Sequence, residues 1–345
     1  MHHLRVDPTS PNDESIRRAA EAIQAGNLMA FPTETVYGLG ADALNPDAVR
    51  KIFKAKGRPV DNPLIVHIAG RDQLSLLTPR FPQVARALAN RFWPGPLTLV
   101  LPRLPHVPDE TTGGLDTVAV RIPDHPVARA LLMASQRAIA APSANRSGRP
   151  SPTRAEHVID DLGEHVAVLL DAGACPIGLE STVVDVSEGR PVLLRPGGIS
   201  HEALEAVVGE VLTPAQESTA LSHRSPGTRY RHYAPRARLV LASPGVPAQM
   251  ARLARRWQQS GERVGTISRR PLPFDAVAGV VAGSIEEYAA GLFAALRELD
   301  AAGCTVIVAE AVEEEGLGRA VMDRLRRAAS GSTAPHESPD TVALP

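Results

Sequence analysis

Short apolar runs alternate with amphipathic segments over the first 211 residues, and this alternation limits the possible folds more than any other sequence feature. The runs are rich in β-branched residues and too short for buried helices, so they predict strands. These strands are expected at 28–31, 64–68, 97–101, 118–122, 139–141, 166–170, 183–186 and 192–194. Helices are expected at 13–25, 46–56, 82–92, 126–135, 153–162 and 201–208. Interleaved elements of this kind predict a large mixed sheet covered by helices.

The pattern breaks at residues 212–238, and a second α/β pattern follows. The break is rich in Ser, Thr, Pro and Arg and has no periodicity, so it predicts a linker long enough to be functional or disordered. Later strands are expected at 239–241, 264–267, 277–281 and 306–309, with helices near 247–259, 284–302 and 316–329. Residues 239–329 therefore predict a small Rossmann-like domain, and residues 330–345 a disordered tail.

Composition excludes several classes of protein. The 345 residues suffice for two domains, and 43% hydrophobic with 22% charged residues is typical of soluble proteins. No apolar run approaches the roughly 20 residues of a membrane span, and the N-terminus lacks a signal-peptide core. Cys175 and Cys304 lie in different predicted domains and suggest neither a disulfide framework nor a zinc site. A cytoplasmic protein is expected.

Charged and polar clusters mark the ends of predicted elements. The helix that begins with Asn45 as N-cap ends at Gly57 and carries the only three lysines in the chain, Lys51, Lys54 and Lys56. Its end, Lys56-Gly57-Arg58, suits a phosphate because an ammonium and a guanidinium stand two residues apart. Taken alone, this motif is a weak signal, because helices often end in Lys-Gly-Arg for capping reasons.

Three further clusters stand at the ends of strands. Ala141–Ser151 offers hydroxyls, an amide and glycine-flanked N–H groups that could form an anion nest, or an ordinary turn. Gly178–Val183 and Arg195–Gly197 each have the same two interpretations. Their joint occurrence at strand ends, where open α/β sheets bind ligands, favours one shared site. No P-loop, dinucleotide fingerprint, nucleophile elbow or zincin motif occurs, and His67 and His232 are lone histidines.

Together these residues resemble the threonylcarbamoyl-AMP synthase family, which has a YrdC-like catalytic domain. The motifs that carry the resemblance are Pro32–Leu39, Lys56-x-Arg58 with Asn62-Pro63-Leu64, Ser143-x-Asn145, Gly178–Val183, Ser225-Pro226-Gly227 and His232–Pro235. The resemblance extends to about residue 330. It implies a YrdC-like twisted mixed sheet with covering helices in residues 1–211, a linker at 212–238 that closes over the active site, and the small Rossmann-like domain at 239–329.

The resemblance also implies roles for individual residues. L-threonine would be bound by Thr35, His67, Arg121, Ala141 (through its backbone) and Ser181. ATP would be bound by Lys56, Arg58, Asn62, Thr117, Ser143, Ser151, Arg195 and Tyr233. The catalytic residues would be Lys56, Arg58, Ser143 and Asn145.

The reaction that the resemblance implies condenses L-threonine, bicarbonate or CO2, and ATP to threonylcarbamoyl-AMP and pyrophosphate. The product would serve threonylcarbamoyl modification of the adenosine next to the anticodon in tRNAs that decode ANN codons. Mg²⁺ would arrive with ATP, held by phosphates and water and not by a protein metal site. The expected partner is a downstream tRNA threonylcarbamoyl transferase complex, with indirect or weak tRNA contact and no membrane.

Two other interpretations use the same residues. An RNA-binding or ribosome-maturation module could place the basic clusters on phosphates, but the net charge is −1 and aromatic residues make up only 3%. A carbamoyl-transfer domain like those of hydrogenase maturation proteins would need cysteine zinc motifs, and the chain has two cysteines. Residues 239–329 show no catalytic constellation, so they are expected to brace the linker or the domain interface.

Overall fold

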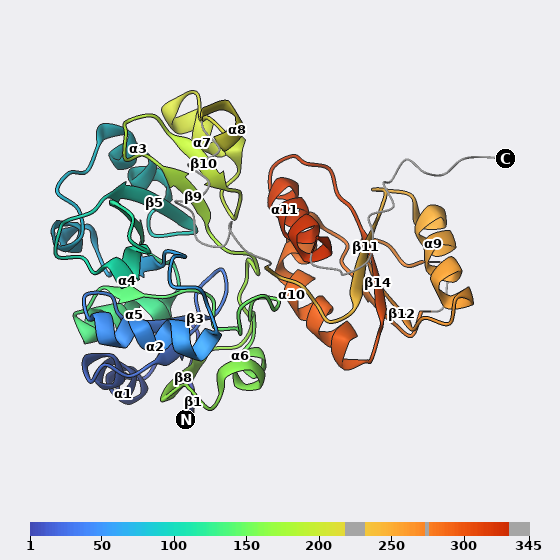
Figure 1. Ribbon diagram of the computed structural model, residues 1–345, viewed down its shortest axis with the longest axis horizontal. Helices are drawn as coiled ribbons and strands as arrows, with labels where there is room; N and C mark the ends of the chain where they lie inside the picture. Colours follow the sequence, from blue (N-terminus) through green and yellow to red (C-terminus); the bar gives the residue numbers. More distant parts are fainter. Residues whose placement is uncertain (218–231, 273–275, 331–345) are drawn as a thin grey trace.

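The computed structural model describes residues 1–217, 232–272 and 276–330, which form two α/β domains (Figure 1). The predicted motif Ser225-Pro226-Gly227, residues 218–231 of the predicted linker 212–238 and residues 331–345 of the predicted disordered tail 330–345 lie outside the described residues. Within these described stretches, no helix combines the length and hydropathy required to cross a membrane.

The first domain is built on a ten-stranded mixed sheet, ordered β1-β8-β2-β3-β7-β4-β6-β5-β9-β10. Its strands are β1 His2–Arg5, β2 Met29–Phe31, β3 Gly38–Asp42, β4 Ile65–His67, β5 Leu97–Pro102, β6 Thr117–Arg121, β7 Ile139–Ala140, β8 Val168–Asp171, β9 Thr182–Asp185 and β10 Val192–Arg195. The sheet contains both parallel and antiparallel neighbours; β4 runs parallel to β6, for example, and antiparallel to β7. The predicted fold class is confirmed.

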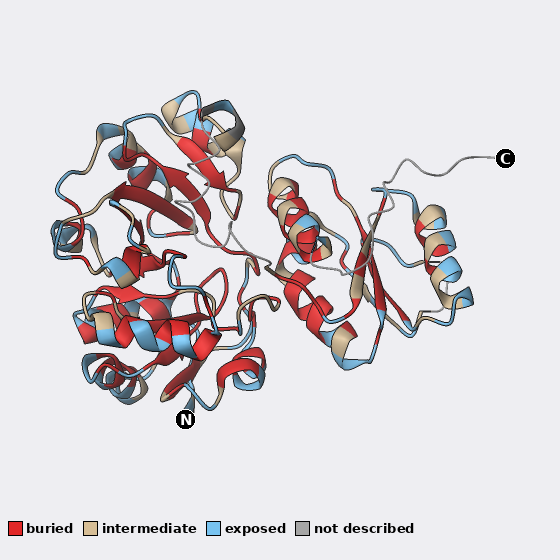
Figure 2. Ribbon diagram, in the orientation of Figure 1, coloured by how far each residue is buried: buried red, intermediate tan, exposed pale blue. Residues whose placement is uncertain are grey.

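Helices cover both faces of this sheet. They are α1 Asp13–Gln24, α2 Pro46–Lys56, the 3-10 helix η1 Arg71–Leu76, α3 Gln83–Phe92, α4 Asp109–Thr112, α5 Pro126–Ser135, α6 Ala155–Leu162, α7 His201–Val208 and α8 Pro214–Glu217. One core packs α2, α3, α6 and α7 against the sheet, and a second packs α1 and α5 against the opposite face. Figure 2 shows the strands almost wholly buried and the outer sides of the helices exposed. Burial on both faces explains why the strands read as continuous apolar runs.

Local signals place the helix ends that matter for the site. The side chain of Asn45 accepts a hydrogen bond from the backbone of Ala48 at 3.1 Å and so caps α2. Gly57 adopts the left-handed conformation (φ 60°) directly after the helix, which a residue with a side chain rarely does. Lys56 and Arg58 therefore leave the helix on either side of a fixed turn.

Five elements had no sequence signal. β3 contains two glycines, β1 is polar and mostly exposed, and η1, α4 and α8 are short. β3 forms because its backbone pairs antiparallel with both β2 and β7. These elements depend on tertiary pairing and not on their own periodicity.

The second domain has a four-stranded parallel sheet, ordered β11-β14-β12-β13. Its elements are β11 Arg238–Ala242, α9 Pro247–Gln259, β12 Val264–Ser268, β13 Ala278–Val281, α10 Ile285–Ala301, β14 Val306–Glu310 and α11 Gly318–Ala329. The last strand inserts between the first two in the order of the sheet. Helices α10 and α11 face the first domain, and α9 covers the far side (Figure 1).

The two domains share one apolar core. Val36 and Leu179 of the first domain and Tyr233 of the linker pack in the same buried cluster as Phe293 and Leu292 of α10. Gly178 approaches α10 so closely that a Cβ atom there would lie 2.4 Å from the Cα of Ala290. This contact fixes the Gly178–Val183 segment against the second domain.

Candidate active site

One pocket gathers the predicted clusters. It lies where the loops after β2 and β7 meet the segments before β4 and β9 and the last residues of β4, β6 and β10. The predicted site residues in its wall are Thr35, Arg58, His67, Arg121, Ala141, Ser143, Asn145, Ser151, Ser181, Arg195 and Tyr233. Residues far apart in the sequence therefore share a single cavity, as the clustering at strand ends predicts.

Arg121 forms the cationic centre of one side of the pocket. Its guanidinium is 3% exposed and forms an ion pair with the buried Glu34, with an N–O distance of 2.6 Å. It also donates to the Thr35 hydroxyl at 2.9 Å and to the Gly95 carbonyl at 3.2 Å. Two of its five N–H donors thus make hydrogen bonds to described residues, and Nη2 contacts Glu34 as an ion pair without a hydrogen bond, so N–H groups are left for a carboxylate ligand.

His67 lies beside Arg121 at the end of β4. Burial, and then the charge of Arg121, lowers the pKa of His67 to about 3, so the ring is neutral at physiological pH. Its Nδ1 atom is buried and has no hydrogen-bond partner among the described residues. An unsatisfied ring nitrogen in a pocket wall is suited to a ligand group. The nearby Ala141 donates its N–H to Ile65 at 2.9 Å, so its carbonyl is the backbone group it can offer.

Lys56 does not line the pocket. Its buried ammonium donates to the carbonyl oxygens of Ser143 and Asn145 at 2.6 and 2.5 Å, from behind the loop that they form. The Ser143 hydroxyl in turn donates to the Asn145 side chain at 2.6 Å. Burial, and then the charge of Arg58, lowers the pKa of Lys56 well below its usual value. The structure thus places Lys56 where it holds the Ser143–Asn145 loop in shape.

Arg58 and Arg195 form a second cationic side. Arg58 donates to the Pro63 carbonyl at 3.1 Å and to the Asn62 carbonyl at 3.4 Å, which turns its guanidinium toward the pocket. Arg195 donates to the Ser181 carbonyl at 3.0 Å and to the Ser181 hydroxyl at 3.2 Å. Two buried guanidinium groups in one wall can neutralise a phosphate chain.

A carboxylate, Glu180, lines the same pocket. Glu180 accepts a short hydrogen bond from the Ser151 hydroxyl and pairs with Arg324 of α11 at 2.7 Å. Burial on its own raises the pKa of Glu180, but the charges of Arg324 and Arg195 more than offset it, so the pKa lies below its usual value. Glu180 is therefore ionised, and the second domain supplies its counter-ion.

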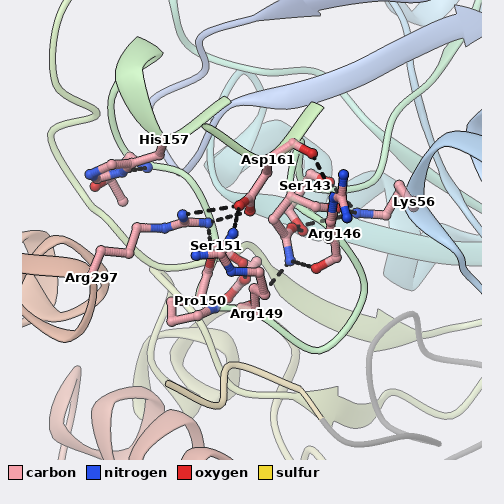
Figure 3. Close-up of polar contacts among 12 residues, drawn as sticks. Lys56, Ser143, Arg146, Arg149, Pro150, Ser151, His157, Asp161 and Arg297 are labelled. Carbon is pink, nitrogen blue, oxygen red and sulfur yellow. Dashed lines mark hydrogen bonds and ion pairs between the residues drawn. The ribbon is translucent and has the colours of Figure 1, made fainter. Parts of the chain in front are cut away.

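A second buried ion pair braces the loop that carries Ser143 and Ser151. Figure 3 shows Arg149 and Arg297 converging on Asp161 of α6, with Arg297 also reaching the Pro150 carbonyl. The Nη2 atom of Arg297, on α10, lies 2.7 Å from Asp161. Arg146 donates to the Asp161 carbonyl at 3.0 Å. The loop is thus held from both domains.

Comparison with known proteins identifies the family. Residues 21–197 match the family described as telomere recombination, and residues 199–330 match the one described as threonylcarbamoyl-AMP synthase, C-terminal domain. A threonylcarbamoyl-AMP synthase of Pyrococcus abyssi is 51% identical over 91% of this chain and 93% of its own length. A second, from Bacillus subtilis, is 47% identical over 94% and 96%. This chain belongs to the threonylcarbamoyl-AMP synthase family.

A solved structure of the family shares the complete fold. The crystal structure of P. abyssi Sua5 complexed with L-threonine matches with a TM-score of 0.91 and 49% sequence identity. The match covers 96% of this chain and 98% of that chain, so it includes both domains. The resemblance drawn from the sequence motifs is confirmed.

Three of the predicted site residues do not line the pocket. Lys56 lies behind the Ser143–Asn145 loop, and Asn62 contributes its carbonyl to Arg58. Thr117 begins β6, whereas Arg121 ends it, so about 13 Å of strand separates them. The assignment of these three residues to ATP binding or catalysis stays a prediction.

Sequence reasoning missed the charged residues of the second domain. Arg324 and Arg297 lie on buried faces of α11 and α10, and their partners are in the first domain. A signal was available: Arg324 stands three or four residues from Val321, Ala320 and Ala328, on the apolar stripe of its helix. An arginine in such a stripe needs a buried partner, and the sequence does not name that partner.

Proposed function

We propose that this chain catalyses the condensation of L-threonine, bicarbonate-derived CO2 and ATP to threonylcarbamoyl-AMP and pyrophosphate. The observation that carries the proposal is the convergence of Arg121, Arg58 and Arg195 on one pocket. The family membership and the L-threonine named with the P. abyssi structure support the same substrates. The product would feed the threonylcarbamoyl modification of tRNA.

The geometry suits a reaction between two anions. The threonine amine adds to CO2 and loses a proton, which gives an N-carboxylate. That carboxylate attacks the α-phosphorus of ATP, the bond to the β-phosphate oxygen breaks, and pyrophosphate leaves. Arg121 would hold the threonine carboxylate, and Arg58 and Arg195 would offset the charge of the triphosphate. Placement and charge neutralisation supply the catalysis, so no covalent nucleophile is needed.

The neutral His67 supports this assignment of the threonine side. A protonated imidazole next to Arg121 would add a second buried cation, whereas the neutral ring offers a nitrogen that can accept a hydrogen bond. The hydroxyls of Thr35 and Ser181 stand in the same wall. Together they match a small amino acid with a carboxylate and a hydroxyl group.

Tyr233 would close the nucleotide side. It is 4% exposed, lies in the pocket wall and belongs to the segment that joins the domains. The next residue, Ala234, donates its N–H to the Gly148 carbonyl at 2.8 Å, which ties this segment to the Ser143–Ser151 loop. A buried aromatic ring there can stack on or hydrogen-bond the nucleotide and exclude water from the reactive product.

Mg²⁺ would enter as part of the ATP substrate. The pocket carboxylate Glu180 and the nearby Glu34 are each paired with a buried arginine. Across the part of the chain that the structure describes, no three His, Cys, Asp or Glu side chains gather as they would around a metal ion. The ion would neutralise phosphate charge and remain coordinated by phosphate oxygens and water.

The test is incubation of the full chain with ATP, Mg²⁺, bicarbonate and a panel of amino acids, followed by mass spectrometry. Threonylcarbamoyl-AMP should form with threonine and should disappear when EDTA or a bicarbonate-free buffer is used. Absence of this product, together with RNA binding that weakens steeply with salt, would favour the RNA-binding interpretation. We further propose a cytoplasmic location and transfer of the product to a tRNA threonylcarbamoyl transferase complex.

A further inference from the structure

The pocket depends on one buried arginine from outside the catalytic domain. Arg324, in the middle of α11, has a fully buried side chain. Burying a guanidinium costs free energy unless its hydrogen-bond and ion-pair partners are well placed. The contacts of Arg324 therefore indicate what this side chain does for the protein. Apart from an ion pair with its neighbour Asp323 at 2.6 Å, those contacts reach three segments of the pocket.

The first contact is the ion pair between Arg324 and Glu180 at 2.7 Å. Glu180 uses its other oxygen to accept from the Ser151 hydroxyl, so the position of Arg324 fixes the position of Ser151 through one carboxylate. Both Glu180 and Ser151 line the pocket, whereas Arg324 does not. The arginine therefore acts on the site through another residue.

The second contact lies next to Arg195. Arg324 donates from Nη1 to the Pro196 carbonyl at 3.1 Å, directly after the arginine in the pocket wall. The adjacent turn is tightly packed, because a Cβ atom on Gly197 would lie 2.3 Å from the backbone nitrogen of Thr182. A shift at Pro196 would thus move both Arg195 and the segment that contains Ser181.

The third contact is with Tyr233. The guanidinium carbon of Arg324 lies 5.4 Å from the centre of the Tyr233 ring, and Phe293 of α10 stacks on that ring at 5.2 Å. Tyr233 also has a positive φ of 64°, a conformation that residues with side chains hold only when their surroundings fix it. The second domain supplies those surroundings.

We propose that Arg324 is a positioning residue that ties the docking of the second domain to the shape of the ATP side of the pocket. It fixes the position of Ser151 through Glu180 and that of Arg195 through the Pro196 carbonyl. It contacts the Tyr233 ring directly. This inference rests on the function proposed above and names a positioning contact of the same site. Because the three oriented residues all belong to the predicted ATP set, loss of Arg324 should weaken ATP use more than threonine use.

The test compares Arg324→Gln with the matched control Arg326→Gln. Arg326 lies on the same helix, but its side chain is 55% exposed and pairs with Glu314 at the surface. In Arg324→Gln, kcat/KM for ATP should fall at least tenfold with a raised KM for ATP, and KM for threonine should rise by a smaller factor, because Ser181 alone of the predicted threonine set lies in the affected segment. The control should match the wild type. A folded Arg324→Gln enzyme with kcat/KM for ATP within threefold of wild type would overturn the proposal.

A second variant separates positioning from folding. Arg324→Gln leaves the Glu180 carboxylate buried without its strongest partner, and the double variant Glu180→Gln/Arg324→Gln removes that charge. The double variant should recover the melting temperature but not kcat/KM for ATP. The single variant Glu180→Gln is measured as well, to complete the double-mutant cycle. Recovery of both quantities would show a purely structural role. This variant also carries the test if Arg324→Gln does not fold.

Hydrogen exchange gives a readout that does not depend on the reaction. Peptides covering residues 146–152 and 178–182 should exchange faster in Arg324→Gln than in wild type or Arg326→Gln, with peptides of β4 and β6 unchanged. Equal exchange in all three proteins would refute the positioning role. If the wild type makes no threonylcarbamoyl-AMP but these peptides respond, the proposed function fails and the positioning role stands.

Discussion

Replacing Lys56 by Met tests whether this lysine stabilises the Ser143–Asn145 loop. The substitution keeps the volume of the side chain and removes the ammonium that donates to two buried carbonyl oxygens. If Lys56 acted only as a phosphate contact, the free protein would lose no stability. The structure predicts instead that the free Lys56→Met protein will be less stable than the wild type.

The magnitude follows from the two carbonyl groups. The Asn145 carbonyl would lose the hydrogen bond that it accepts from the Lys56 ammonium. Leaving a buried carbonyl unsatisfied costs about 1–3 kcal/mol. The Ser143 carbonyl keeps the Asn145 N–H at 3.0 Å, so its loss is about 1 kcal/mol. Methionine avoids the burial of a charge, which offsets part of this. The net change in the free energy of unfolding should be about 2–3 kcal/mol, or roughly 4–12 °C in melting temperature.

The assay is thermal unfolding of the free protein, together with pyrophosphate release. Lys54→Met is the matched control, because Lys54 is in the same turn of α2 and exposed. Lys56→Met should melt lower than the control, and its turnover should fall at least tenfold, about 1.4 kcal/mol of transition-state stabilisation. A melting temperature within about 2 °C of wild type would refute the loop-anchor reasoning. A tenfold loss of turnover without that shift would instead assign Lys56 to the substrate.

Three more predictions follow from other parts of the site. Arg121→Lys keeps the charge but loses the planar fork, so KM for threonine should rise at least tenfold while KM for ATP does not; an equal rise in both would contradict the assignment. Gly178→Ala would force a Cβ onto the Ala290 backbone and should make the interdomain segment more sensitive to proteolysis, whereas Gly173→Ala, also at positive φ but in open space, should not. The folded protein holds His67 neutral down to a pKa of about 3 and the unfolded chain protonates it near 6.5, so stability should fall as pH drops from 7 to 5, by about 2 kcal/mol for this residue. Between pH 7 and 5, His67→Gln should lose less melting temperature than the wild type. Equal losses in the two proteins would refute the inference that acid destabilises the fold through His67.

Much of the fold is readable from local sequence. Asn45 and Gly57 mark the ends of α2 because capping depends on residues within one turn. The apolar runs predict the central strands because a strand that is buried on both faces needs apolar side chains at successive positions. β3 was missed, since its two glycines carry no periodic signal and its pairing partners β2 and β7 are distant in sequence.

The candidate site was predicted in part. The clusters at Arg58, Ser143 and Ser181 were found because loops at strand ends carry polar residues that a core does not need. The different placement of Lys56 could not be foreseen, because an ammonium can serve a phosphate or a backbone carbonyl with the same chemistry. The assignment of Thr117, at the other end of β6 from Arg121, to ATP stays a prediction.

The sequence by itself determined the two α/β patterns, the helix ends and the set of residues able to bind anions, since each of these depends on neighbours along the chain. Only the tertiary structure decided which charges meet. Glu180 and Arg324 are 144 positions apart, and their pairing follows from the docking of α11 against the first domain. A buried charge must find a partner, but composition and spacing cannot show which distant helix provides it.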